Sequence, residues 1–110
     1  MNKLRYSPES KQDLQDIKTY IANELLNPTA AARITGDILK RIQSLLNFPK
    51  MGTPLTTVLE IDTDYRFLVC GHYVVFYLYH DKTISVMRVL YGKRDFMKIL
   101  FNEFNGKVEN

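Results

Sequence analysis

The chain has 110 residues and a formal net charge of +3, and 45% of its residues are hydrophobic. This length and apolar content suit one domain with its own core, and they exclude an intrinsically disordered chain. The sequence holds no run of about 18 apolar residues, so we expect no transmembrane helix and no membrane partner. Charged residues and Pro8 come before any apolar stretch, so we also expect no secretory signal.

The residues that could bind a metal or form a disulfide are few. Cys70 is the single cysteine, and His72 and His80 are the two histidines. One cysteine cannot form an internal disulfide or a cysteine-based zinc site, so we expect no metal and no cofactor, in a reducing cytoplasm. The pI of about 9.0 suits contact with nucleic acid or an acidic protein, and equally suits a basic soluble domain without such a partner.

The first half of the chain predicts a strand and two helices. Residues 4–6 alternate in polarity, as in an edge strand, and Ser7-Pro8-Glu9 is a typical helix start. Asn27-Pro28-Thr29 ends the first helix and begins the second. The apolar residues spaced by three or four along the two helices are Leu14, Ile17, Ile21 and Leu25, then Ala31, Ile34, Ile38, Ile42 and Leu45. Because the turn between the helices is short, they should form an antiparallel hairpin.

The second half predicts an antiparallel meander. Residues 48–64 are a connecting loop with room for a short strand at 58–61. Three β-rich runs follow, separated by turns short enough for hairpins, at residues 65–70, 73–80 and 84–91. The middle run is apolar or aromatic almost throughout, which predicts a central strand. Asp95 should cap a last short helix before a polar tail at 103–110. The fold class is therefore α+β.

Five segments, in this order and spacing, resemble the RelE/ParE superfamily of toxins from type II toxin–antitoxin pairs. The segments are Tyr6–Leu14, Phe48–Leu55, Tyr65–Val69, Tyr73–Tyr77 and Arg88–Asp95. The resemblance spans about residues 3–101. It implies one toxin domain over residues 1–102, with the order β-α-α-β-β-β-α and a helical hairpin packed on one face of an antiparallel sheet. It also implies a hetero-oligomer with a cognate antitoxin that silences the toxin.

The superfamily contains toxins with different targets. RelE-like members act on the ribosome and cut messenger RNA, using basic side chains to stabilise charge and a tyrosine or histidine to move protons. ParE-like members instead poison DNA gyrase. Both kinds arrest growth, and such modules serve in plasmid stabilisation.

The nuclease pattern is only partly present in this chain. Arg66 and Arg94 match basic positions of the nucleases. Leu68, Val74 and Leu100 stand where the nucleases carry further catalytic groups, and these apolar side chains cannot bind phosphate or move a proton. Cys70–Phe76 resembles ParE proteins instead. We therefore favour a ParE-like toxin that inhibits DNA gyrase through protein–protein contact over an enzyme.

Two alternatives remain from the sequence. The first is an mRNA endonuclease with an altered site, in which Arg66, Arg94 and Tyr91 are catalytic. The second is a non-toxic remnant that retains only partner binding. In every case we expect the partner-binding residues to be basic, and they are Arg66, Arg88, Lys93, Arg94 and Lys98. For Arg66 and Arg88, an ordinary solvent-facing position on the sheet is also compatible with the pattern.

Overall fold

The computed structural model describes residues 1–58, 60 and 62–92. Along the chain lie β1 (Lys3–Tyr6), α1 (Pro8–Thr19), the π-helical turn η1 (Tyr20–Glu24), α2 (Pro28–Gln43), the 3-10 turn η2 (Ser44–Leu46), β2 (Thr53–Pro54), the 3-10 turn η3 (Leu55–Thr57), β3 (Arg66–Cys70), β4 (Tyr73–His80) and β5 (Thr83–Tyr91). The predicted final helix from Asp95, the tail, and Lys93, Arg94 and Lys98 lie outside the described residues.

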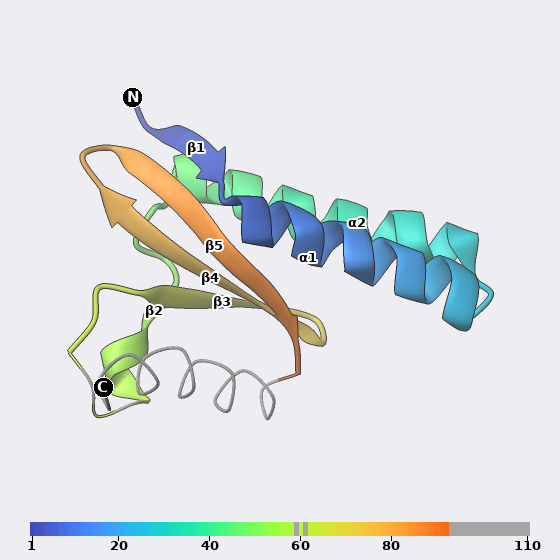
Figure 1. The fold of residues 1–110 in the computed structure, drawn as a ribbon. Coiled ribbons are helices and arrows are strands. Elements are labelled where there is room, and N and C mark those ends of the chain that lie inside the picture. Colours follow the sequence, from blue (N-terminus) through green and yellow to red (C-terminus); the bar gives the residue numbers. More distant parts are fainter. Residues whose placement is uncertain (59, 61, 93–110) are drawn as a thin grey trace.

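The fold has two layers, a five-stranded sheet and the hairpin of α1 and α2, which confirms the α+β class (Figure 1). The strand order is β1-β5-β4-β3-β2, so β4 is central as predicted. The pairs β2–β3, β3–β4 and β4–β5 are antiparallel, but β1 pairs with β5 in parallel. This parallel pair is the one departure from the predicted antiparallel sheet. It is possible because about 80 residues lie between β1 and β5, so no short turn forces the two strands to run in opposite directions.

Both predicted helix starts are confirmed. The Ser7 Oγ accepts a hydrogen bond of 3.0 Å from the Ser10 backbone N–H at the start of α1. The Asn27 Oδ1 accepts one of 3.0 Å from the Ala30 N–H at the start of α2. Pro8 and Pro28 occupy the first turns, where a missing N–H costs nothing. None of the helices in the described part of the chain is long and apolar enough to cross a membrane.

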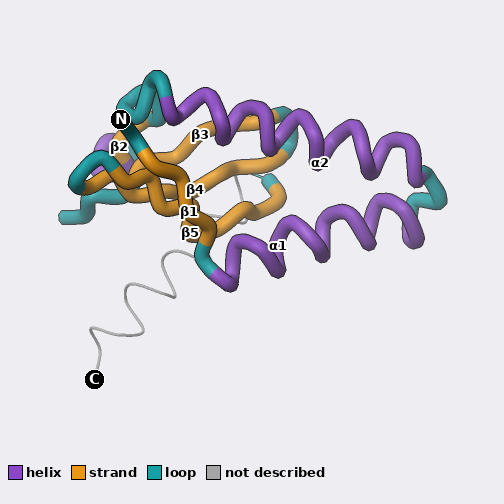
Figure 2. Tube along the Cα trace, turned by 90° about the horizontal axis from the view of Figure 1, so that it is seen from above, coloured by secondary structure: helices purple, strands orange, loops and turns teal. Residues whose placement is uncertain are grey.

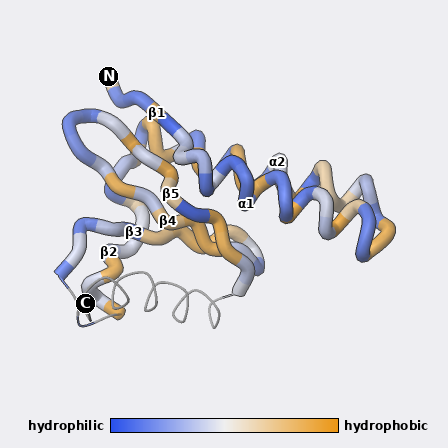
Figure 3. Tube along the Cα trace, viewed as in Figure 1, coloured by the Kyte–Doolittle hydropathy of each residue, from blue (hydrophilic) through white to orange (hydrophobic). Residues whose placement is uncertain are grey.

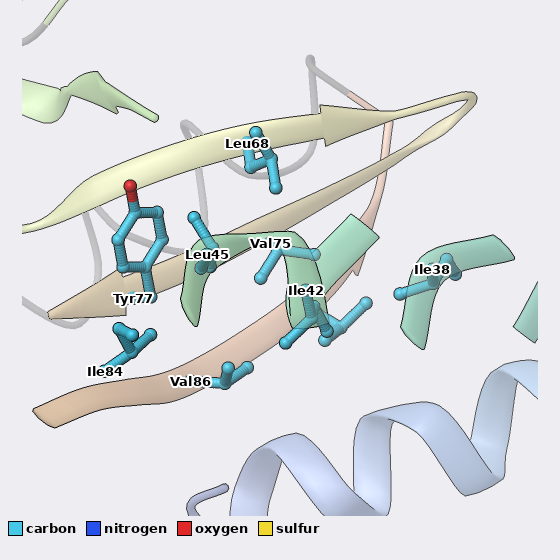
Figure 4. Close-up of a cluster of buried hydrophobic side chains, with 9 residues drawn as sticks. Ile38, Ile42, Leu45, Leu68, Val75, Tyr77, Ile84 and Val86 are labelled. Carbon is cyan, nitrogen blue, oxygen red and sulfur yellow. The ribbon is translucent and has the colours of Figure 1, made fainter. Parts of the chain in front are cut away.

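The main core lies between the hairpin and the sheet. The predicted apolar face of α2 packs there against alternate side chains of β3, β4 and β5 (Figure 4). The buried members are Ile38, Ile42, Leu45, Leu68, Val75, Tyr77, Ile84, Val86 and Val89. A second cluster of Leu55, Val74, Phe76 and Leu90 lies on the opposite face, so β4 is buried on both sides. Figure 3 agrees with this burial, because the central strands are hydrophobic whereas the β4–β5 turn is hydrophilic.

The loop before β2 is held by the Tyr77 hydroxyl, which reaches it from the core. This hydroxyl donates to the Pro49 carbonyl at 2.8 Å and accepts from the Gly52 N–H at 2.9 Å. The loop then supplies the short strand β2, earlier in the chain than the predicted 58–61. Val58 instead closes the turn η3, and residues 59 and 61 lie outside the described residues.

The buried Tyr77 phenol should make stability sensitive to alkaline pH. Burial raises its pKa, although the Gly52 hydrogen bond and Arg66 partly oppose the rise. The folded chain therefore keeps the phenol neutral at a pH where the unfolded chain has begun to ionise it. Its contribution is complete below about pH 10 and is lost as the pH rises through the raised value. Urea unfolding between about pH 8 and pH 11 should show this loss, and the Tyr77→Phe variant should show a shallower one.

Candidate protein-binding face

Arg66 was predicted as a catalytic or partner-binding residue, and the structure places it beside the loop before β2. Its Nη1 donates to the Gly52 carbonyl at 2.8 Å and to the Lys50 carbonyl at 3.2 Å. Arg66 pairs across the sheet with Tyr77, whereas Tyr91 pairs with Tyr73 at the other end of β4. These positions are four residues apart along β4, or about 13 Å. The structure therefore does not bring Arg66 and Tyr91 together.

Arg88, another predicted contact residue, is bound to a partner within the chain. Its Nε donates to the Asp13 Oδ2 at 2.7 Å and its Nη2 to the Asp13 Oδ1 at 3.0 Å. The same Oδ2 accepts from the Val89 backbone N–H at 2.9 Å. Both side chains are largely buried, with 25% and 13% of the Arg88 and Asp13 side-chain surfaces exposed. A two-pronged ion pair of this kind fixes orientation as well as charge.

The same contacts cover the part of β5 that extends beyond the end of its neighbour β1. The parallel pairing with β1 ends at Val86, and a register shift in the β4–β5 pair follows. From there on, α1 covers the outer edge of β5. The Ser7 N–H donates to the Val86 carbonyl, the Ser7 hydroxyl donates to the Met87 carbonyl, and Asp13 accepts from Val89. The backbone N–H and hydroxyl of Ser7 and the carboxylate of Asp13 thus satisfy edge groups that a neighbouring strand would otherwise bind.

Asp13 is not among the residues that the sequence patterns indicate. The signal was present, because Asp13 lies four residues before Ile17, in phase with the apolar face of α1. An acidic residue on the inward side of a helix requires a buried partner. That the partner is Arg88 depends on the tertiary structure.

The positions where nucleases carry further catalytic groups are buried. Leu68 is 4% exposed and faces the helices, and Val74 is 1% exposed and belongs to the cluster on the opposite face. They lie on opposite sides of the sheet, so no single substrate could contact both. Leu100 lies outside the described residues. Among the described residues, no group of three or more His, Cys, Asp or Glu side chains could hold a metal ion.

An aromatic cluster lies at the end of the sheet nearest the hairpin tip. Tyr91 is 56% exposed and contacts two rings, edge-to-face with His72 at 6.3 Å and tilted on Tyr73 at 5.3 Å between ring centroids. Burial raises the pKa of Tyr73, and the nearby Tyr91 and Tyr20 phenols raise it further. The Tyr73 phenol therefore remains neutral near pH 7. Exposed aromatic rings held in this way are typical of protein-binding surfaces.

A groove of about 630 Å³ runs between this cluster and the overhanging helices. Figure 2 shows α1 and α2 side by side and extending beyond the sheet. The groove is lined by Asp16, Ile17, Tyr20, Ile21, Leu25, Ile34, His72, Tyr73 and Tyr91. Most of these side chains are apolar or aromatic, which suits a protein surface more than a polyanion.

A second hollow of about 500 Å³ continues from the first on the α2 side. It shares Ile34, His72 and Tyr73 with the first hollow, and Arg33 and Arg41 of α2 line it. Cys70 also lines it, and burial raises the pKa of its thiol, although the Arg41 charge and hydrogen bond partly lower it. We call the two hollows together the hairpin groove. This groove could not be predicted from the sequence, because its lining comes from four separate segments.

Comparisons with known proteins agree with this fold. Residues 4–96 match the family described as the ParE toxin of the type II toxin–antitoxin system parDE. Among solved structures, the chromosomal ParDE system of P. aeruginosa aligns with a TM-score of 0.70 and 20% identity, over 84% of this chain and 98% of that chain. A mutant YafQ from E. coli aligns with a TM-score of 0.52 and 15% identity, over 87% of this chain and 98% of that one. No curated protein matches the chain.

The structural neighbours share the fold, and the family match covers most of the sequence, including the helical hairpin and all the described strands. The chain therefore belongs to the ParE toxin family of type II toxin–antitoxin systems, within the RelE/ParE superfamily.

Proposed function

We propose that this toxin arrests growth as ParE-like proteins do, by inhibiting DNA gyrase through protein–protein contact. The observation that carries the proposal is the burial of Leu68 and Val74 in two separate apolar clusters, where the nucleases need groups that contact RNA. Loss of one charge-stabilising donor costs about 3 kcal/mol of transition-state stabilisation. Loss of several leaves no efficient route to cleavage.

The intramolecular contacts of Arg66 and Arg88 support the same proposal. Arg66 binds two loop carbonyls, and Arg88 is held by Asp13, so both guanidinium groups have structural roles. The surface near the hairpin tip is instead aromatic and apolar, as expected for a protein partner. Arg94, Lys93 and Lys98, outside the described residues, stay predicted contact residues.

A paired assay tests this function. The purified chain is added to a gyrase supercoiling reaction and, separately, to a translating cell extract. We expect loss of supercoiling with intact messenger RNA, and we expect the antitoxin to reverse the loss when it is added first. Messenger cleavage at codon positions with normal supercoiling would instead identify the endonuclease alternative. The Tyr91→Phe variant keeps the ring for packing but has no phenolic proton to transfer. It should therefore still inhibit gyrase if the toxin acts by contact, and it should lose messenger cleavage if Tyr91 is catalytic.

A further inference from the structure

The loop before β2 contains a β-turn that two side chains of the central strands hold in place. The turn begins at Phe48 and ends at Met51, whose N–H donates to the Phe48 carbonyl at 3.1 Å. Pro49 occupies its second position, which proline favours. Tyr77 of β4 donates to the Pro49 carbonyl, and Arg66 of β3 donates to two further carbonyls of the same loop. The sheet therefore fixes the position of this turn, which we call the 48–51 turn.

The 48–51 turn carries apolar side chains that are open to solvent. Phe48 is 64% exposed, more than any other Phe or Tyr in the described part of the chain, and Met51 is 38% exposed. Lys50, which lies between them in the sequence, is also exposed. A ring that stays hydrated adds little to the stability of the chain. It favours binding instead, because a ring on a fixed backbone loses little conformational entropy when a partner covers it.

The positive charge around the turn is not neutralised within the described chain. Lys50 and Arg66 have no carboxylate within 4.0 Å among the described residues. A protein partner gains an ion pair if it places a carboxylate beside Lys50. A nucleic acid fits this surface less well, because one lysine flanked by apolar side chains offers no track of cations for successive phosphates.

The turn lies at the end of the sheet opposite the aromatic cluster. Arg66 and Tyr77, which hold the turn, pair with each other at one end of β4, whereas Tyr73 and Tyr91 pair at the other end. None of the residues of the turn is among those that line the hairpin groove. The turn is therefore a second exposed surface, separate from that groove.

We infer that the 48–51 turn is a contact surface for DNA gyrase, with the Phe48 ring in an apolar pocket of the enzyme and a gyrase carboxylate beside Lys50. This inference rests on the proposed function. An exposed turn requires a partner that supplies the pocket, as a large folded enzyme does and a narrow peptide segment does not. Phe48 and Met51 supply affinity, and Lys50 supplies orientation.

The test compares variants in the gyrase supercoiling reaction, by the concentration of toxin that halves supercoiling. Phe48→Gln should raise this concentration about tenfold or more, because it removes the ring from the pocket. Met51→Gln should raise it about threefold. Leu39→Gln is the matched control for Met51→Gln, because Leu39 is also 38% exposed but lies on α2, outside the turn. It should change the concentration less than about twofold.

A second pair of variants tests the charge. Lys50→Glu should raise the same concentration about threefold or more, most strongly at low salt, because the new carboxylate repels that of gyrase. Lys11→Glu is its matched control, because Lys11 is an exposed lysine of α1 and undergoes the same charge change. It should change the concentration less than about twofold. Every variant should unfold near the urea midpoint of the unchanged chain, because each substituted side chain is exposed.

The outcomes distinguish this contact from the proposed function. Failure of the unchanged chain to inhibit gyrase would overturn both. Inhibition by Phe48→Gln and Lys50→Glu at the same concentration as by the unchanged chain would overturn the contact and leave gyrase inhibition intact. An equal loss in Leu39→Gln or Lys11→Glu would also overturn it, because the loss would not then depend on the turn. A dimer, seen by light scattering, that Phe48→Gln dissociates would show a second copy on the turn and overturn the inference.

Discussion

Replacing Asp13 with alanine should lower the free energy of unfolding by about 2–4 kcal/mol, one of the two largest effects we expect from a single substitution. The change removes a bidentate ion pair and leaves both the Arg88 guanidinium and the Val89 N–H without their carboxylate. Loss of the carboxylate from a largely buried guanidinium is costly, and partial exposure of Arg88 moderates the cost. Urea unfolding followed by circular dichroism measures the change.

Two further variants separate the components of this effect. Asp13→Asn keeps an oxygen that can accept from Val89 but loses the charge, so it should cost less than alanine. Asp16→Ala is the matched control on the same helix, because Asp16 accepts only an exposed hydrogen bond from Gln12 in the described structure. It should change stability by less than about 0.5 kcal/mol. Equal effects of Asp13→Ala and Asp16→Ala would contradict a structural role for the Asp13–Arg88 pair.

Replacing Gly52 with alanine should be comparably destabilising, by about 2–4 kcal/mol. An added Cβ would lie 2.5 Å from the Tyr77 hydroxyl oxygen and 2.9 Å from the Phe67 carbonyl oxygen. Tyr77 is fully buried, and its hydroxyl both donates and accepts a hydrogen bond. Neither the Tyr77 ring nor the strand that carries the Phe67 carbonyl can therefore move away freely. The loop would have to shift and give up its hydrogen bonds to Tyr77 and Arg66.

Gly36→Ala is the matched control for this prediction. Gly36 lies inside α2, and an added Cβ there meets nothing within 4 Å. Alanine should therefore stabilise the chain by about 0.5–1 kcal/mol, through helix propensity alone. In a Tyr77→Phe background, Gly52→Ala should cost less than in the native chain because the closest clashing atom is gone. Equal costs in both backgrounds would show that the crowding at Gly52 does not arise from the hydroxyl.

Much of the fold could be predicted because the relevant signals are local. The caps at Ser7 and Asn27 satisfy helix N–H groups only three residues away, and the strand-rich runs are separated by short turns. The spacing of apolar residues identified the face of α2 that packs on the sheet. The parallel direction of β1 could not be predicted in this way, because its partner β5 lies at the other end of the described chain.

The candidate site was less accessible to prediction from sequence. Arg66 and Arg88 alternate with apolar neighbours, a pattern that is the same for a solvent-facing arginine and for one that binds a buried partner. The structure shows that both make intramolecular contacts. The hairpin groove is assembled from α1, α2 and the ends of the strands, and the π-helical turn that brings Leu25 into it has no simple sequence pattern.

The sequence by itself determined the two helices, the strands β1, β3, β4 and β5, the α+β class and the toxin family, because periodicity, caps and family motifs are patterns of residues close in the chain. Only the tertiary structure decided which charged side chains are available to a partner and which are held in contacts within the chain. Asp13 and Arg88 are 75 residues apart, and their pairing requires α1 to lie along the uncovered edge of β5. Such a contact depends on long-range packing, which local sequence patterns do not encode.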